Sequence, residues 1–210
     1  MQILDKSFDT PLENIRTDET LLKEAESSPA PPTLRFWESS TYFVVLGSGN
    51  KAHEEAHEPL CEKESIPILK RCSGGGTVLQ GPGCMNYALI LPFSYHPDLK
   101  GIKTSNSYIM QKNADAFSTC LNTTVEVKGY TDLAINNIKF SGNAQRRLKS
   151  HLLFHGTILY NFDLSKIETY LKSPPRQPEY RQNRSHLDFV RNIAVSQKDI
   201  KDTLIKAWQQ

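Results

Sequence analysis

The most informative segment of the sequence is residues 70–78, Lys70-Arg71-Cys72-Ser73-Gly74-Gly75-Gly76-Thr77-Val78. Three consecutive glycines between apolar segments lose much conformational entropy when they are ordered, so we expect their backbone to pass close to a ligand. The N–H groups of such a loop can turn toward an anion, and Arg71 adds a planar, charged fork for phosphate or carboxylate. A plain wide turn is the alternative. The loop is not a Walker motif, because no Gly-Lys-Ser/Thr follows at the required spacing.

A second polar cluster lies on a predicted strand that begins at Ile138. Strand alternation places Lys139 and Ser141 on the face opposite the large apolar side chains. A lysine held in this way can direct its ammonium into a site, and the small residues Gly142 and Ala144 leave room for a ligand beside it. The alternative is an ordinary lysine of an edge strand.

Three other patterns each allow two interpretations. His155 lies in an apolar strand and is either a hydrogen-bonded core residue or part of a site. Residues 53–57 (HEEAH) match the zinc-protease pattern, but their polar neighbours and the following Pro59 favour a solvated helix, so we expect no metal site. Residues 47–52 (GSGNKA) match a dinucleotide fingerprint, but the next strand lacks its acidic residue. A tight strand-to-helix turn explains these glycines equally well.

Periodicity and capping signals predict a mixture of helices and strands. Thr10 and Glu13 form a capping box for the first helix, which the segment 27–32 ends. Further helices are expected at 51–63 and 104–121, from Ser165, and near Ser196, and a surface loop at 173–185. The predicted strands are 34–37, 42–46, 66–69, 87–91, 124–128, 132–135, 138–141 and 152–160. Hairpin-type links join several strands, so the predicted fold class is α+β, with a mixed sheet flanked by helices.

Composition narrows the function classes further. The 210 residues include 25 Lys+Arg and 23 Asp+Glu, a net charge of +2, which disfavours a general nucleic-acid binder. No apolar run approaches the roughly 20 residues of a membrane helix, and the first twenty residues are too acidic for a signal peptide. The four cysteines form no CxxC pair, and without a secretory signal we expect free thiols. The sequence therefore predicts one cytoplasmic domain spanning residues 1–210.

Four segments together resemble the lipoate–protein ligase A / octanoyltransferase (biotin/lipoate protein ligase) family. They are KRCSGGGTV, the GPG that follows, TDLAINNIKFSGNAQRR and FHGTILYNFDL, and the match runs from about Asp18 to the final helix. The resemblance implies a catalytic domain with the α+β, class II synthetase-like fold of biotin and lipoate ligases. It implies ATP (with Mg²⁺) as cofactor, lipoate or octanoate as substrate, and a lysine of a lipoyl carrier domain as acceptor.

The resemblance also implies roles for individual residues. Lys139 falls on the central catalytic lysine of the family, which contacts both the acyl carbonyl and the phosphate. Asp132 is a candidate partner of adenine or of the acceptor lysine. Phe36, Trp37, Val45 and Val78 are candidates for an apolar acyl tunnel. The residues expected to bind ATP or the acyl-adenylate are Arg71, Ser73, Gly74, Gly75, Gly76, Thr77, Val78, Leu79, Lys139, Ser141, Gly142 and Ala144.

The sequence departs from the family where the pattern HDxGN is expected, because residues 80–84 read QGPGC. This GPG is more similar to the octanoyltransferase branch. Cys84 offers a thiol near the expected adenylate and could form an acyl thioester. That role requires a lowered pKa, which Arg71 and Lys139 could provide. The nucleophilic cysteine of known transferases lies elsewhere, and no cysteine follows Tyr130 here.

Three functions are compatible with these features. The first is an ATP-dependent lipoate–protein ligase. The second is an ATP-independent octanoyl or lipoyl transferase acting between carrier proteins, and the third is a non-catalytic family member that binds lipoyl domains. Many family ligases have a smaller accessory domain after the catalytic domain. The sequence ends at Gln210, one helix after the catalytic motifs, so we expect no such C-terminal domain, and a separate accessory protein could supply it.

Overall fold

The computed structural model describes residues 1–209 and contains two β-sheets with helices on both faces. The larger sheet has seven strands in the order β1-β2-β6-β10-β9-β8-β7, and all its pairs are antiparallel except β1–β2. Its strands are β1 (Gln2–Asp5), β2 (Thr33–Trp37), β6 (Cys84–Pro92), β7 (Glu126–Lys128), β8 (Asp132–Ile135), β9 (Ile138–Arg147) and β10 (His151–Leu159).

The smaller sheet has the order β4-β3-β5 and carries the glycine loop between its outer strands. Its members are β3 (Phe43–Leu46), β4 (Ile68–Lys70) and β5 (Val78–Gln80), with β3–β4 parallel and β3–β5 antiparallel. The loop from residue 71 to residue 77 therefore leaves one edge strand and returns as the other. This fixes both ends of the loop on the same sheet.

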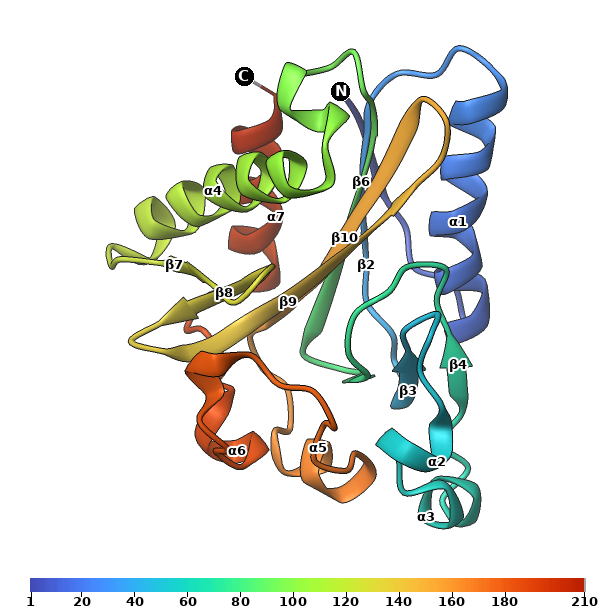
Figure 1. Cartoon of the computed structure of the whole chain (residues 1–210), viewed down its shortest axis with the longest axis vertical. Helices are drawn as coiled ribbons and strands as arrows, with labels where there is room; N and C mark the ends of the chain where they lie inside the picture. The colour runs from blue at the N-terminus through green and yellow to red at the C-terminus, as the bar shows by residue number, and fades with distance from the viewer. Residues whose placement is uncertain (210) are drawn as a thin grey trace.

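Helices cover the two faces of the large sheet unequally. Helices α4 (Ile102–Leu121) and α7 (Gln197–Trp208) lie on one face, and α1 (Pro11–Ser27) packs on the other (Figure 1). The face under α4 and α7 holds the main core, in which Phe117, Phe140 and Trp208 are buried. The face under α1 is covered only in part, and the smaller sheet lies beside the rest of it (Figure 1).

Short elements complete the chain. They are α2 (Ala52–Glu55), α3 (Glu58–Lys63), η1 (Pro97–Lys100), α5 (Ser165–Tyr170), η2 (Glu179–Arg181) and α6 (His186–Phe189). None of the helices described within residues 1–209 is long and apolar enough to cross a membrane. The predicted α+β class with a mixed sheet and flanking helices is confirmed.

Several element boundaries differ from the sequence prediction for local reasons. Strands β1 and β5 were not predicted, because four and three residues give too short a pattern. The single helix expected at 51–63 is two helices, since Ala56 adopts an extended conformation and bridges Leu171. Strand β9 continues to Arg147, well beyond Ser141, because it pairs with β10 over most of its length.

The capping box predicted for the first helix forms in part. Thr10 caps α1 by accepting from the Glu13 N–H (3.3 Å), but the Glu13 carboxylate accepts from the Thr10 hydroxyl (2.7 Å) rather than from its backbone N–H. Ser196 and Asp199 form a complete capping box at α7. Ser165 and Glu168 have the spacing of a further box at α5, but this box does not form. The Glu168 carboxylate instead accepts a hydrogen bond of 2.9 Å from the backbone N–H of His186 and ties α5 to α6.

Candidate active site

A cavity of about 440 Å³ opens between the glycine loop and strands β8, β9 and β10, with residues 172–190 as a third wall. Its volume is in the usual range for small-molecule sites. Most of the residues predicted from the sequence line it: Arg71, Gly75, Gly76, Thr77, Val78, Leu79, Asp132, Lys139, Ser141, Gly142, Ala144 and His155. The structure thus gathers segments far apart in the sequence around one cavity.

Four predicted residues do not line the cavity, namely Ser73, Gly74, Cys84 and Phe36. Ser73 is fully buried beneath the loop, and Gly74 is exposed on its outer side. Cys84 is buried at the start of β6, and burial together with the charge of Glu38 raises the pKa of its thiol far above the ordinary value. Neither Arg71 nor Lys139 is among the groups that shift this pKa, which argues against activation of Cys84 as a nucleophile.

Arg71 shapes the glycine loop from inside. Its Nε donates to Ser73 Oγ (3.1 Å), its NH1 donates to the Val45 carbonyl (3.3 Å), and its NH2 donates to the carbonyls of Gly74 and Gly76 (both 2.7 Å). Desolvation lowers the pKa of Arg71 to about 10, which leaves the guanidinium charged at neutral pH. Four of its five N–H donors are therefore used within the protein, and one remains for a ligand.

The turn after β3 supports the outside of the same loop. A Cβ on Gly47 would lie 2.2 Å from the Gly75 carbonyl oxygen, so only glycine allows this approach. The Asn50 amide donates to Gly75 O (3.1 Å) and to the Glu55 carboxylate (2.8 Å), which also accepts the Thr77 N–H (3.2 Å). The GSGNKA motif is thus a tight turn that holds the glycine loop. This agrees with the strand-to-helix turn that we gave as the alternative to a dinucleotide fingerprint.

Lys139 faces the cavity from β9 on the opposite wall. Its ammonium pairs with Asp132 Oδ1 at 2.7 Å, and about a quarter of its side chain is exposed. A Cβ on Gly142 would lie 2.7 Å from Lys139 Nζ. The glycine predicted to make room for a ligand therefore also makes room for the ammonium itself. Two of the three ammonium donors are not engaged by Asp132 and remain available to a ligand.

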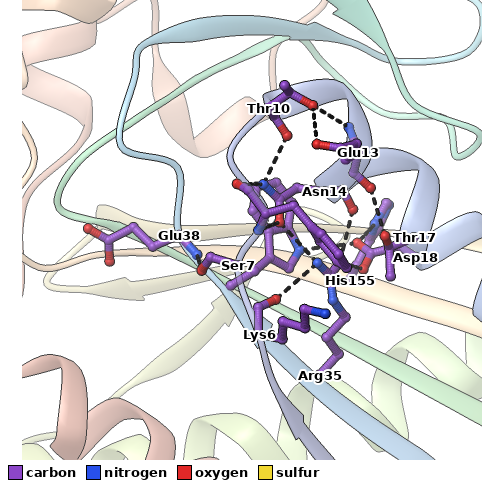
Figure 2. Close-up of polar contacts among 12 residues, drawn as sticks. Lys6, Ser7, Thr10, Glu13, Asn14, Thr17, Asp18, Arg35, Glu38 and His155 are labelled. Atoms are coloured by element: carbon purple, nitrogen blue, oxygen red, sulfur yellow. Dashed lines mark hydrogen bonds and ion pairs between the residues drawn. The ribbon is translucent and has the colours of Figure 1, made fainter.

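A buried polar chain runs from the glycine loop to α1. Ser73 Oγ lies 2.5 Å from His155 Nε2, and His155 Nδ1 lies 3.6 Å from Asp18 Oδ2. Ser73 Oγ accepts from Arg71 and can also donate its proton to Nε2. In the tautomer that carries the imidazole proton on Nδ1, that N–H faces Asp18. Arg35 donates to Asp18 and, at 3.0 Å, to Asn14 Oδ1, and both partners come from α1 (Figure 2). His155 therefore combines both interpretations, being hydrogen-bonded in the interior and facing the cavity.

The inner wall of the cavity is largely apolar. Trp37, Val45 and Val78 line it as expected, together with Ile15. Phe36 does not line it, because it points to the opposite face of β2 and is buried in the main core. In this wall, Gln80 is buried and its Oε1 has no hydrogen-bond partner among the described residues. A buried polar atom without a partner requires an explanation, and a polar ligand in the cavity would provide one.

Residues 80–84 differ from the family pattern, and close contacts explain why two of these positions are glycine. A Cβ on Gly81 would lie 2.5 Å from the Tyr42 ring, and one on Gly83 would lie 2.1 Å from the Asn161 backbone. Gly83 also has a φ of +83°, which favours glycine. The GPG is therefore a packed turn whose two glycines are required by close contacts.

The HEEAH segment does not form a metal centre. His53 and Glu54 belong to α2, whereas His57 caps α3, so the two histidines do not share one helix face. No group of three or more His, Cys, Asp or Glu side chains within residues 1–209 is arranged to hold a metal ion. The solvated-helix interpretation holds for His53 and Glu54, which are exposed. Glu55 and Ala56 are instead buried, and Glu55 holds the glycine loop.

Sequence reasoning missed Asp18, Glu55, Gln80 and the wall formed by residues 172–190. Asp18 had a usable signal, because it interrupts the apolar stripe of Ile15, Leu22 and Ala25 on one face of α1. A charged residue on such a face requires a buried partner, here Arg35. The wall at 172–190 had no such signal, since its Pro- and Arg-rich composition also fits a solvated surface loop.

Comparisons with known proteins identify the family of this chain. Residues 10–209 match the family model described as lipoyl protein ligase A/B catalytic domain. A probable lipoate-protein ligase A of Mycoplasma genitalium is 33% identical over 162 residues, covering 77% of this chain and 46% of that protein. An octanoyltransferase LipM of Carboxydothermus hydrogenoformans is 29% identical over 180 residues, covering 76% and 65%. The chain spans about half the length of the ligase relatives that it matches.

Solved structures share the fold at low sequence identity. A bi-partite lipoate protein ligase from Thermoplasma acidophilum, described with its E2 lipoyl domain, has a TM-score of 0.82 and 20% identity over 99% of this chain and 82% of that one. A lipoate-protein ligase A bound with ATP has a TM-score of 0.79 and 20% identity, covering 99% and 83%. The expected fold of the lipoate and biotin ligases is thus confirmed. With the family model matching nearly the whole chain, this protein belongs to the lipoyl protein ligase A/B catalytic domain family.

Proposed function

We propose that this protein is a lipoate–protein ligase, which activates lipoate or octanoate with ATP and transfers the acyl group to a lysine of a lipoyl carrier domain. The observation that carries the proposal is the arrangement of the cavity. The Lys139 ammonium and the glycine loop form opposite walls, and an apolar wall adjoins them. This arrangement matches the three parts of an acyl-adenylate, namely its phosphate, its nucleoside and its apolar chain.

In the first step, a carboxylate oxygen of the acid attacks the α-phosphorus of ATP, and pyrophosphate leaves. In the second step, the neutral ε-amine of the carrier lysine attacks the acyl carbonyl carbon, the acyl–oxygen bond breaks, and AMP and one proton leave. Both steps develop negative charge on oxygen. An ammonium fixed in the cavity stabilises that charge without reorganisation, and Lys139 with its two available donors is suited to this role.

The protein groups present fit such a ligand. The single remaining N–H of the Arg71 guanidinium and the glycine loop are suited to the phosphate end. The Gln80 amide oxygen, which has no hydrogen-bond partner among the described residues, lies in the position that the family fills with histidine. It offers a polar contact in a wall that is otherwise largely apolar. Asp132 remains our candidate partner for the acceptor lysine or for adenine.

The second candidate is an octanoyl or lipoyl transferase, favoured by the similarity to LipM and by the GPG turn. A thioester route requires a reactive thiol in the cavity. Within residues 1–209, no cavity-lining residue is a cysteine. Cys61 and Cys84 are buried with raised pKa values, Cys72 has its pKa raised to about 11, and Cys120 is exposed away from the cavity. These placements support the ligase over the thioester transferase.

The deciding experiment measures the mass of a lipoyl carrier domain after incubation with the protein. Separate reactions contain ATP with lipoate, ATP with octanoate, preformed lipoyl-AMP, or an octanoylated carrier without ATP. The ligase predicts a lipoyl or octanoyl mass increase in the first two reactions, which Lys139→Ala abolishes.

The other outcomes are equally distinct. Transfer from lipoyl-AMP alone indicates that activation requires a separate accessory protein. Transfer only from the octanoylated carrier, lost in Cys84→Ser, contradicts the ligase and supports the transferase. Tight carrier binding without any mass change would indicate a non-catalytic family member.

A further inference from the structure

The wall formed by residues 172–190 is tied to the backbone of the Lys139 strand. Val190 bridges Lys139 in parallel, and the Arg191 N–H donates to the Lys139 carbonyl at 2.8 Å. The Arg184 guanidinium donates to the Asn137 carbonyl at 2.9 Å, on the turn before the same strand. The predicted surface loop at 173–185 is thus anchored by Arg184, and the residues that follow it are anchored directly beside Lys139.

Tyr180 connects this wall to the side chain that holds Lys139. Its hydroxyl donates to Asp132 Oδ2 at 2.8 Å, while the Lys139 ammonium lies 2.7 Å from Asp132 Oδ1. Each carboxylate oxygen therefore has its own donor, and the two donors come from different elements. Because Asp132 is largely buried, these contacts fix its orientation.

Tyr180 is itself held in place from several sides. Its ring packs on the Phe189 ring, with the two centroids 5.1 Å apart. The Arg181 guanidinium in turn lies over the Phe189 ring, 4.8 Å from its centroid. Gly129, on the turn between β7 and β8, lies next to the Tyr180 ring, since a Cβ added there would be in van der Waals contact with it at 3.6 Å. Burial and the charge of Asp132 raise the pKa of Tyr180 far above its ordinary value, so the hydroxyl keeps its proton and remains a donor.

We propose that Tyr180 is a positioning residue, which fixes the Asp132 carboxylate and through it directs the Lys139 ammonium toward the reacting oxygens. This inference rests on the proposed ligase function for its kinetic consequence. A carboxylate rotates readily about its terminal torsion, and the lysine side chain is long and flexible. A displacement of about 1 Å in a catalytic group can cost up to about a hundredfold in rate, so a rigid support for Lys139 has a direct chemical effect.

The test is a double-mutant cycle with Tyr180→Phe and Asp132→Ala. Tyr180→Phe keeps the ring on Phe189 and removes only the hydroxyl. We expect kcat for acyl-AMP formation to fall roughly tenfold, the equivalent of one hydrogen bond to a charged group, with KM for ATP and for lipoate nearly unchanged. In the Asp132→Ala background, the same change should cost nothing further, because the group through which Tyr180 acts is absent.

Tyr160→Phe is the matched control. The Tyr160 hydroxyl also donates to a carboxylate, that of Glu38 at 2.9 Å, but neither residue lines the cavity. Its removal should leave kcat unchanged. Wild-type kcat in Tyr180→Phe, or an equal loss with and without Asp132, would overturn the proposal.

A second measurement does not require activity. Lys139 is labelled with an amine-reactive acetylating reagent, and its modification rate is followed by peptide mass spectrometry. We expect faster labelling in Tyr180→Phe and in Asp132→Ala, no further increase in the double variant, and no change in Tyr160→Phe. If wild type forms no acyl-AMP but labelling follows this pattern, the proposed function fails while the positioning role stands. An unchanged labelling rate in Tyr180→Phe contradicts the positioning role whatever the activity.

Discussion

The two basic residues on opposite walls of the cavity use their hydrogen-bond donors in different ways. Arg71 directs four of its donors to its own loop and to the neighbouring strand. Lys139 directs one donor to Asp132 and leaves two for the cavity. The sequence suggested similar roles for both, as cations beside an anionic ligand. The structure instead separates them into a residue that shapes the site and a residue that can act in it.

This difference follows from the chemistry of the two side chains. A guanidinium is planar and presents donors in a fixed fork, so it can hold several carbonyls of a glycine-rich loop at once. An ammonium is a compact point charge on a flexible chain, and one carboxylate is enough to orient it. Substitution of Lys139 should therefore reduce mainly activity, whereas substitution of Arg71 should reduce both activity and stability.

The largest expected effect on activity is that of Lys139→Ala. Loss of a fixed charge that stabilises a developing oxyanion costs about a hundredfold to a thousandfold in rate. The Lys139 side chain is partly exposed, and Asp132 keeps its hydrogen bond from Tyr180, so we expect the melting temperature to change little. Pyrophosphate exchange driven by lipoate measures the rate, and calorimetry measures the melting temperature. A fall in rate below threefold would remove the distinction between the two residues.

Arg71→Lys should instead reduce activity and stability together. Lysine keeps the charge but cannot reach Ser73, Gly74 and Gly76 at once, so the loop carbonyls lose their partner. We expect the free energy of unfolding to fall by about 2 kcal/mol, with a weaker affinity for ATP. Urea unfolding and a binding titration measure the two effects. Full stability with a loss of affinity alone would show that Arg71 contacts the ligand rather than shaping the loop.

A smaller effect is expected from Gly142→Ala, which tests the space around the ammonium. The added methyl would lie 2.7 Å from Lys139 Nζ, and the flexible end of the lysine must then move away from Asp132. We expect a loss of about tenfold in kcat with little change in stability. Gly49→Ala is the control, because its added Cβ meets nothing within 4 Å. Equal kcat values for the two variants would show that the exact position of the ammonium does not matter.

The smallest expected effect concerns pH and the wall at 172–190. Burial lowers the pKa of His186, and the charges of Arg181 and Lys139 lower it further. Two contacts act in the opposite direction, namely the charge of Glu168 and the hydrogen bond between His186 Nε2 and the Lys172 carbonyl (3.3 Å). The folded state then binds fewer protons than the unfolded state once the pH falls below about 6.5. The contribution of His186 to stability is complete above that pH. It is lost as the pH falls through the pKa of His186 in the folded state.

Urea midpoints between pH 7.5 and pH 5 measure this contribution. His186→Gln keeps an N–H donor for the Lys172 carbonyl but cannot gain a proton. The variant should therefore lose less stability than wild type over this range. Identical pH dependence in the two proteins would show that the histidine does not titrate with folding.

The sequence by itself determined the α+β class and the glycine loop, and it singled out Lys139 as a candidate. These features depend on local patterns, because periodicity, glycine runs and strand alternation are set by near neighbours in the chain. The resemblance carried by KRCSGGGTV and by the Lys139 segment also identified the family, which the comparisons confirmed. The candidate residues on β9 could be predicted for the same reason, since alternation alone gives their shared face.

Only the tertiary structure decided how those groups are used. No local pattern showed that Arg71 faces inward, that Cys84 is buried, or that Tyr180 from a Pro- and Arg-rich segment reaches Asp132. Each of these facts depends on contacts between residues distant in sequence, and the same side chain can bind a ligand or a carbonyl. Which partner it takes is set by the packing of the two sheets and the wall at 172–190, because a buried polar group must be satisfied by whatever the fold brings beside it.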